Sequence, residues 1–487
     1  MTSRRQRGLL ASFVVSATAA ATVLSAGGAI ADDHSSKAAP TGYLYTSTND
    51  IDQGSNDLAG FAIWPNGKLT PLKQGQVRTG GTGVDNGYIP GVNIGNAKLG
   101  PMDNDTPVVS TPNGKFVYTV NGHSDTIAAF RVGDDGKLIK VPGSPFKSGG
   151  INPNSLSVNP AGTLLAVSNR NEDPARQDLL KSGKPSIVTF RIAANGALTQ
   201  AATADVAPAV YGVGTGNLPT QVLFPYVGDV LFVNNFRVDA VFPCPDGVTC
   251  NQRWAESDQV NGDIQSLAVG KRGALAPTGQ FNLPPVAGET VPNIPLNSWA
   301  HPKKRILYTD TVINNGVGVM TYDEAGRLSY VTRVDSDSVD VCWLRTNQAG
   351  TRLYQISNLA KPGTTDVGSS IEVYDISGKN ALKPVLIQRV SLPNNGTEDF
   401  VNDRGATQAG STAFHPTLSP DDKFFYVSMQ RVNQTPSNTN PNGNVIVGYK
   451  INADGTLGTT PVTTVDLAKA GFPTDSRAWG LTAVAAK

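Results

Sequence analysis

The chain has 487 residues, and its 40 Lys and Arg against 39 Asp and Glu give a formal net charge of +1 at pH 7. A charge balance this close to zero gives no reason to expect nucleic acid or another polyanion as a partner. Gly (51) and Pro (33) are frequent and aromatic residues make up 7%, so the composition favours short strands and turns over long helices.

The first 31 residues have the pattern of a secretory signal peptide. Three arginines among the first seven residues precede an uncharged run over residues 9–24, and Ala29 and Ala31 mark a small-residue cleavage site. We therefore expect an exported chain, extracellular or located in the periplasm or cell envelope, that begins with a disordered tail over residues 32–40. No later segment approaches the roughly 20 apolar residues of a membrane-spanning helix.

One unit recurs seven times over residues 41–487. Each unit has a strand of the Leu-Tyr-Val-Ser type, a third strand of alternating pattern and a closing turn of the Asn/Asp-Gly-x-Leu type. A Gly turn between two alternating runs is the strongest short-range hairpin signal, because both turn residues need positive φ. The seven second strands are predicted at Tyr43–Ser47, Phe116–Val120, Leu164–Ser168, Val230–Asn234, Ile306–Asp310, Leu353–Ser357 and Phe424–Ser428.

Seven such units predict an all-β fold, a seven-bladed β-propeller whose blades are four-stranded sheets. The first unit has no inner strand of its own, because Tyr43 follows the polar tail directly, whereas residues 478–484 at the C-terminus form an unused strand of that type. We expect this last strand to pair into the first blade and close the ring, which leaves no raw sheet edges. The uneven spacing of the turn glycines argues against an open solenoid. Residues 41–487 are then a single domain.

The three cysteines fall into two groups. Cys244 and Cys250 flank a Pro/Gly/Asp-rich loop, and in an exported chain we expect a local disulfide between them. Cys342 lies in an apolar run, so we expect a buried free thiol rather than a nucleophile.

The repeat resembles that of the lactonase-type seven-bladed propellers, a family that includes 6-phosphogluconolactonase and the fungal carboxymuconate lactonising enzyme. The resemblance is clearest in residues 111–121, 159–169 and 419–428, where Pro-x-Gly or Pro-Asp-Asp precedes the Tyr-Val-Ser strand. Surface-layer propellers with a Tyr-Val-Thr-Asn repeat are similar less specifically. The family resemblance implies a lactonase-like hydrolase or cycloisomerase. Phosphogluconolactone is cytoplasmic, so an exported member is expected to act on another small lactone or carboxylate.

Ligand sites of propellers are expected where the loops between blades and those joining second to third strands surround the channel mouth. Lactone hydrolysis needs a general base, which His or Glu supplies near pH 7, and donors for the oxyanion. Arginines can play the second role and can also hold a carboxylate in bidentate fashion. Our candidates are His415 or Glu398 as the base, and Arg170, Arg237 or Arg477 as the clamp.

Other polar residues fall at related positions of the repeat. His123 begins a second-to-third loop, and Asn154, Gln221 and Asn297 stand where inner strands start. His301 belongs at the opposite end of its blade, where we expect a structural role. Core packing is the expected role of three tryptophans in inner strands, Trp299, Trp343 and Trp479.

Motifs of several other enzyme classes are missing, including Gly-x-Ser-x-Gly, His-Glu-x-x-His and the phosphate-binding Gly loop. Residues 49–54 look calcium-like but lack the closing Glu of an EF-hand, so calcium at the channel mouth stays open without a positive signal. We expect a monomer with no cofactor and no metal requirement. Two functions stay open: an exported lactonase-like enzyme that opens or closes a small lactone ring, and a non-catalytic propeller that binds a ligand, cell-envelope or extracellular partner through its loops.

Overall fold

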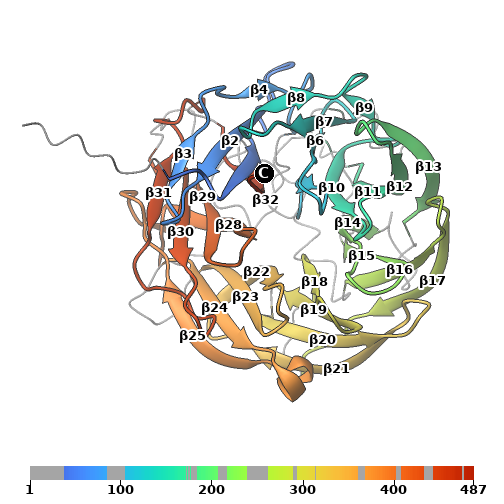
Figure 1. Cartoon of the computed structure of the whole chain (residues 1–487). Coiled ribbons are helices and arrows are strands. Elements are labelled where there is room, and N and C mark those ends of the chain that lie inside the picture. Colours follow the sequence, from blue (N-terminus) through green and yellow to red (C-terminus); the bar gives the residue numbers. More distant parts are fainter. Residues whose placement is uncertain are drawn as a thin grey trace, which may run out of the picture. The chain divides into compact units, whose positions relative to one another are not determined.

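Short antiparallel strands form seven larger sheets and one two-stranded hairpin, and Figure 1 shows the seven larger sheets as the blades of a ring. The computed structural model describes residues 38–84, 105–171, 173, 176, 184–206, 217–237, 262–288, 293–312, 314–359, 368–401, 407–432, 442–473 and 476–487, and only the backbone of Asn217, Phe236, Arg237 and Leu359. The predicted signal peptide, most of the predicted tail and the predicted Cys244–Cys250 disulfide lie outside these residues.

The first two blades each have a fourth strand that is broken into two short pieces, so β4 pairs with β2 and β9 pairs with β7. Blade 1 consists of β32 (Trp479–Ala485), β1 (Gly42–Ser47), β2 (Asp57–Ile63), β3 (Leu69–Pro71) and β4 (Val77–Arg78). Blade 2 consists of β5 (Val108–Ser110), β6 (Phe116–Asn121), β7 (Thr126–Val132), β8 (Leu138–Lys140) and β9 (Phe146–Lys147).

Blades 3 to 5 are four-stranded sheets whose strands follow chain order from the inside outwards. Blade 3 consists of β10 (Pro153–Val158), β11 (Leu164–Asn169), β12 (Ser186–Ile192) and β13 (Leu198–Asp205). Blade 4 consists of β14 (Asn217–Leu223), β15 (Val230–Arg237), β16 (Asp263–Val269) and β17 (Leu275–Asn282). Blade 5 consists of β18 (Ser298–Ala300), β19 (Ile306–Thr311), β20 (Gly316–Tyr322) and β21 (Leu328–Asp335).

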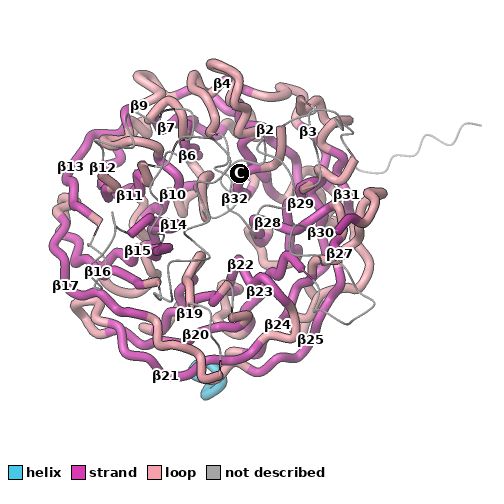
Figure 2. Tube along the Cα trace, turned by 180° about the vertical axis from the view of Figure 1, so that it is seen from behind, coloured by secondary structure: helices cyan, strands magenta, loops and turns pink. Residues whose placement is uncertain are grey.

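Blades 6 and 7 follow the same order and enclose a small hairpin between them. Blade 6 consists of β22 (Val339–Thr346), β23 (Arg352–Leu359), β24 (Ser370–Asp375), the 3-10 helix η2 (Gly378–Leu382) and β25 (Val385–Ser391). The hairpin is β26 (Phe400–Val401) with β27 (Thr407–Gln408), and blade 7 consists of β28 (Ser411–Leu418), β29 (Phe424–Arg431), β30 (Val445–Lys450) and β31 (Thr463–Asp466). In Figure 2, the helix η2 lies at the rim of the ring.

The C-terminal strand closes the ring as the sequence predicts. Strand β32 pairs antiparallel with β1, with Gly42 opposite Ala485 and Tyr43 opposite Val484. Figure 1 shows the red C-terminal strand beside the blue strands of blade 1. The seven-bladed fold is therefore confirmed, and each second strand lies where the repeat places it.

Hydrophobic clusters between neighbouring blades form the core. One cluster, for example, joins Phe61 of blade 1 to Tyr426 of blade 7 and Leu481 of the closing strand. Complete burial of a large apolar side chain stabilises a fold by about 1.5–3 kcal/mol. Each blade interface therefore contributes to the stability of the fold, and the hydrophobic core extends around the ring rather than lying at one centre.

Tyrosine hydroxyls of the second strands link five of the seven blades to the next one. Tyr45 donates to the carbonyl oxygen of Gly136, at 2.6 Å, in the closing turn of blade 2. The same link joins Tyr118 to Gly196, Tyr308 to Ala381, Tyr354 to Gly455 and Tyr426 to Gly67. Blade 3 has Ala166 at this position, and the Thr189 hydroxyl donates to Gly273 instead. The Tyr of one unit and the closing-turn Gly of the next are thus hydrogen-bonded to each other across four blade interfaces.

The two ends of the ring carry different connections. We call the end with the second-to-third loops, such as residues 122–125, and the links between blades the loop face. The opposite end, with the first-to-second turns such as residues 111–115, is the turn face. None of the helices in the described part of the chain has the length and apolar character needed to cross a membrane.

Candidate functional site

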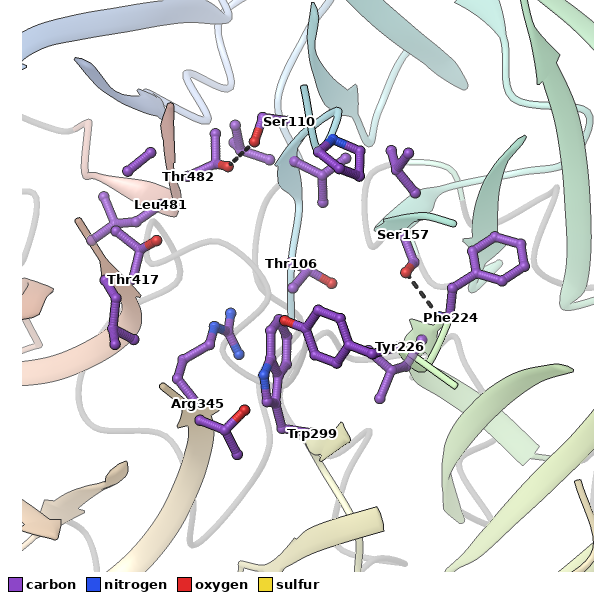
Figure 3. Close-up of a pocket in the computed structure, with 18 of the residues that line it drawn as sticks. Thr106, Ser110, Ser157, Phe224, Tyr226, Trp299, Arg345, Thr417, Leu481 and Thr482 are labelled. Carbon is purple, nitrogen blue, oxygen red and sulfur yellow. Dashed lines mark hydrogen bonds between the residues drawn. The ribbon is translucent and has the colours of Figure 1, made fainter. Parts of the chain in front are cut away.

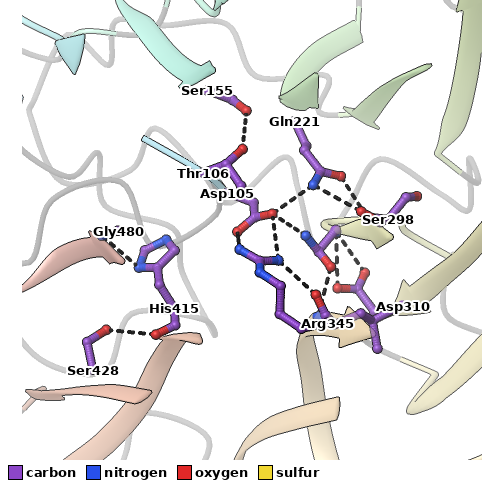
Figure 4. A network of polar contacts seen from close by, with 12 residues as sticks. Asp105, Thr106, Ser155, Gln221, Ser298, Asp310, Arg345, His415, Ser428 and Gly480 are labelled. Carbon is purple, nitrogen blue, oxygen red and sulfur yellow. Dashed lines mark hydrogen bonds and ion pairs between the residues drawn. The ribbon is translucent and has the colours of Figure 1, made fainter. Parts of the chain in front are cut away.

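His415, our first candidate for the base, is a buried residue. It lies inside β28 rather than at its start, because this strand begins at Ser411 and bulges between Ala413 and Pro416. Its ring centroid lies 4.8 Å from that of Trp479 and 5.2 Å from that of Trp343, and the side chain is wholly buried. The Gly480 N–H donates to its Nδ1 at 3.3 Å, as Figure 4 shows.

The other four candidates lie in different environments. Glu398 is exposed in the loop between β25 and β26. Arg170 and Arg477 are buried near the loop face, where the Arg170 N–H donates to the Asn152 carbonyl oxygen. The Arg237 side chain lies outside the described part of the structure. The two cavities described below are lined by none of His415, Glu398, Arg170 and Arg477, so the structure does not gather the candidates around one of these cavities.

A histidine–aspartate pair lies on the loop face between blades 2 and 3. His123 Nδ1 is 2.7 Å from Oδ2 of Asp173, and the two side chains are 38% and 1% exposed. A carboxylate that accepts the Nδ1 hydrogen fixes the ring and leaves Nε2 as the basic nitrogen. The pair therefore has the arrangement of an oriented general base with access to solvent.

Arg176 forms ion pairs with Asp173 and with a second carboxylate, that of Asp125. Its Nε lies 2.7 Å from Asp173, and its Nη1 lies 2.6 Å from Asp125. Burial opposes the charge of the guanidinium, but the hydrogen bonds and charges of Asp125 and Asp173 raise its pKa overall. Because Asp173 is shared between His123 and Arg176, its position is fixed from two sides.

A shallow recess adjoins His123 and is lined by Gly80, Gly81, Thr82 and Ser124. The Ser124 hydroxyl oxygen accepts the Thr82 N–H at 2.8 Å, and the Thr82 hydroxyl oxygen accepts the Gly54 N–H at 2.8 Å. Each hydroxyl oxygen is held by an amide and can direct its own hydrogen at a bound group. The recess thus combines an oriented base with two hydroxyl donors, and we call it the loop-face recess.

A second polar centre lies within the ring around Asp105, which is wholly buried. Its carboxylate accepts hydrogen bonds from Gln221 Nε2, at 2.7 Å, and from Asn297 Nδ2. Both terminal nitrogens of Arg345 lie 3.4 Å from it. Figure 4 shows these groups converging from three blades on the segment that precedes β5. This Asp105 cluster ties blades 2, 4, 5 and 6 together.

The Asp105 cluster accounts for two of the polar residues that the repeat places at inner strands. Gln221 and Asn297 bind Asp105, whereas the Asn154 amide donates to the carbonyl oxygens of Pro219 and Thr220. Asp310 accepts the Leu296 and Asn297 N–H groups, and burial raises the pKa of its carboxyl. The amide side chains of Asn154, Gln221 and Asn297 therefore form hydrogen bonds within the protein.

The Asp105 cluster also supports a cavity of about 430 Å³ that opens on the turn face. Ends of all seven inner strands line this channel pocket, together with the first-to-second turns. Figure 3 shows Arg345, Trp299 and Tyr226 on one side, and Thr106 nearby. The Arg345 guanidinium lies 4.0 Å from the centroid of the Trp299 ring. We expected a site on the loop face, and Trp299, expected in the core, is half-buried in this pocket.

His301 and Cys342 have the environments that the sequence predicts. His301 is buried on the turn face, where its Nδ1 accepts the Lys303 N–H at 3.0 Å, consistent with a structural role. Cys342 is a buried free thiol, and burial raises its pKa well above the usual range, as expected for an inert cysteine. In the described parts of the chain, no cluster of three or more His, Cys, Asp or Glu side chains could hold a metal ion.

Comparison with known proteins agrees with the fold. Residues 103–177 match the family model described as "Lactonase, 7-bladed beta-propeller", and the curated proteins contain no match. A putative 6-phosphogluconolactonase from Bacteroides fragilis has 15% identity and a TM-score of 0.53, over 87% of this chain and 97% of that one. The periplasmic gluconolactonase of Pseudomonas aeruginosa has 13% identity and a TM-score of 0.55, over 92% of this chain and 99% of that one.

A third similar structure carries a different description. The hypothetical selenium-binding protein of Sulfolobus tokodaii has 14% identity and a TM-score of 0.56, over 91% of this chain and 93% of that one. The class of this protein is therefore a seven-bladed β-propeller. Within that class it is similar to the lactonase propellers, and the segment that matches their family model contains His123, Arg170, Asp173 and Arg176.

Proposed function

We propose that the chain is an exported lactonase-type hydrolase that opens a small lactone at the loop-face recess. The observation that carries the proposal is the 2.7 Å contact between half-exposed His123 and buried Asp173. Two further features support it: the family match spans both residues, and residues 1–31 have the pattern of a signal peptide. We assign the base to His123 because His415 is packed among aromatic rings.

The proposed reaction uses a water molecule as the nucleophile. His123 Nε2 takes a proton from water while the oxygen attacks the carbonyl carbon of the lactone. The hydroxyl groups of Ser124 and Thr82 donate to the oxyanion that develops on the carbonyl oxygen. The ring C–O bond then breaks, and the alkoxide takes the proton back from His123. The product is a hydroxy acid, which releases one proton at neutral pH.

Asp173 and Arg176 have positioning roles in this scheme. Asp173 holds the Nδ1 hydrogen and stabilises the imidazolium that forms during proton transfer. Arg176 keeps Asp173 in place through its own ion pair. Arg170, our candidate clamp from the sequence, is buried at the start of the same loop and does not line the recess, so we assign it no contact with the substrate.

The proposal is tested by measuring acid release from a panel of neutral and carboxylated lactones by pH-stat, with and without EDTA. We expect acid release on at least one substrate, unchanged by EDTA, because the proposed residues need no metal. A folded protein that is silent across the panel would contradict the proposal. That result would favour the alternative of a propeller that binds its ligand without turnover.

A further inference from the structure

The channel pocket has the dimensions of a small-molecule site. Its volume of about 430 Å³ lies in the range of about 300–1,000 Å³ that is typical of ligand pockets. All seven blades contribute to its wall, so its shape is fixed by the closed ring rather than by long loops. It lies on the turn face, whereas the loop-face recess lies at the other end, between loops of blade 1 and the loop that joins β6 to β7.

Tyr226 presents aromatic surface to this pocket. The side chain stands in the turn between β14 and β15 and is 47% exposed although it lines a cavity. The Tyr226 and Trp299 rings form an edge-to-face pair at a centroid distance of 6.5 Å, and the Arg345 guanidinium lies 4.0 Å from the centroid of the Trp299 ring. Trp299 is thus occupied by its neighbours, and Tyr226 offers the ring face on which a flat apolar surface can stack.

Apolar side chains such as Leu156 and Leu223 make up most of the remaining wall, and hydroxyl groups lie among them. Ser157 accepts the Phe224 N–H at 2.9 Å, and Ser110 and Thr482 are bonded to each other at 2.9 Å, as Figure 3 shows. Thr106 and Thr417 add two more hydroxyls. A hydroxyl group both donates and accepts hydrogen bonds, so these side chains suit a ligand that itself carries several groups able to donate and accept.

The charges around the pocket disfavour an anion. Arg345 is the cation of the lining, and the buried carboxylate of Asp105 already lies 3.4 Å from its terminal nitrogens. A second carboxylate, Asp422, stands in a turn at the rim, where it accepts the Gln348 N–H at 2.7 Å. An anionic ligand would therefore meet no net positive charge.

From these features we propose that the channel pocket binds a neutral ring bearing hydroxyl groups, of the size of a pyranose sugar. One face of the ring stacks on Tyr226, and its hydroxyls bond to the Ser and Thr groups and to Arg345. The site is independent of the proposed lactonase activity, because none of its residues lies in the loop-face recess.

Isothermal titration of the whole protein with D-glucose, D-galactose and D-xylose tests this proposal, with sodium benzoate as the anionic ring. We expect saturable binding of at least one sugar and none of benzoate. Tyr226→Ala should weaken sugar binding about tenfold, which corresponds to about 1.4 kcal/mol. Tyr226→Phe keeps the ring and should bind within about twofold of the unaltered protein.

Tyr226 is a suitable position because its exposed side chain can be shortened without opening the core, and a thermal melt of each variant checks the fold. His123→Ala is the matched control and should bind the sugar unchanged while losing hydrolysis. Absence of saturable binding by every sugar, tighter binding of benzoate, or sugar binding unaffected by Tyr226→Ala would each overturn the proposal. Silence in the lactone assay has no bearing on it.

Discussion

The two faces of the ring hold side chains of different character. On the loop face, His123, Asp173, Arg176 and Asp125 form a charged network in loops of unequal length. On the turn face, aromatic rings and hydroxyls line a pocket built from short turns that the repeat specifies. Long variable loops can gather charged groups from two blades, whereas short turns give a fixed shape. The comparison suggests chemistry at one face and recognition at the other.

Substitution of His123 is the most direct test of the proposed chemistry on the loop face. His123→Ala should lower kcat by about 10²–10⁴-fold, because a positioned general base contributes that factor. Asp173→Asn should lower it less, since the base remains but loses its orienting charge. Steady-state kinetics on the best substrate of the lactone panel measures both effects. Equal turnover in the unaltered protein and His123→Ala would rule out the assigned role.

The largest stability effect is expected at the Asp105 cluster that supports the turn-face pocket. Arg345→Leu removes the cation from a buried carboxylate and should lower the free energy of unfolding by about 3–5 kcal/mol. The matched control is Arg327→Leu, which breaks an exposed pair with Asp323 and should leave the free energy of unfolding nearly unchanged. Urea unfolding measures both, and equal losses would show that the Arg345–Asp105 pair is not a structural link.

Substitution of His415 distinguishes a packing role of this side chain from a catalytic one. His415→Ala empties a space between Trp343 and Trp479 and should cost roughly 2–4 kcal/mol of stability. Turnover per folded molecule should stay near that of the unaltered protein. Loss of turnover at unchanged stability would instead support our first expectation from the sequence, that His415 is the base.

The smallest expected effect is a pH dependence of stability at His301. Burial, followed by the charge of Lys304, lowers the pKa of this histidine below 6.5. Its contribution is therefore complete above pH 6.5 and is lost as pH falls through the lowered pKa, since the unfolded chain binds the proton first. His301→Gln should flatten the stability curve below pH 6.5 in urea unfolding at a series of pH values. An unchanged slope would contradict this assignment.

The repeat could be predicted from the sequence because each unit carries its own local signals. We expected positive φ at both residues of a closing turn, but only the glycine has it: Gly67, Gly136 and Gly196 have φ of 81°, 77° and 85°. Alternation in the strands sets which side chains enter the interfaces. Strand order and ring closure by the last strand followed from these patterns and from the missing inner strand of the first unit.

The site was harder to predict because its contacts join distant segments. His415 has the sequence context of a strand start, but its burial depends on Trp343 and Trp479, which come from the two neighbouring blades. His123 was noted as a loop residue, but its partner Asp173 lies 50 residues away in a loop without a regular pattern. Asp105 follows another such loop.

The tyrosine links have a consequence for how the chain could be rearranged. The link from Tyr426 to Gly67 joins the last blade to the first in the same way as the links between consecutive blades. The ends also meet, because the Ala486 N–H donates to the Thr41 carbonyl oxygen at 3.1 Å. The junction between the last blade and the first is therefore held by a side-chain link and a backbone bond as well as by the pairing of β32 with β1. A circular permutant in which the two ends of the propeller are joined, with new termini between the exposed Gly378 and Lys379, should keep the same ring.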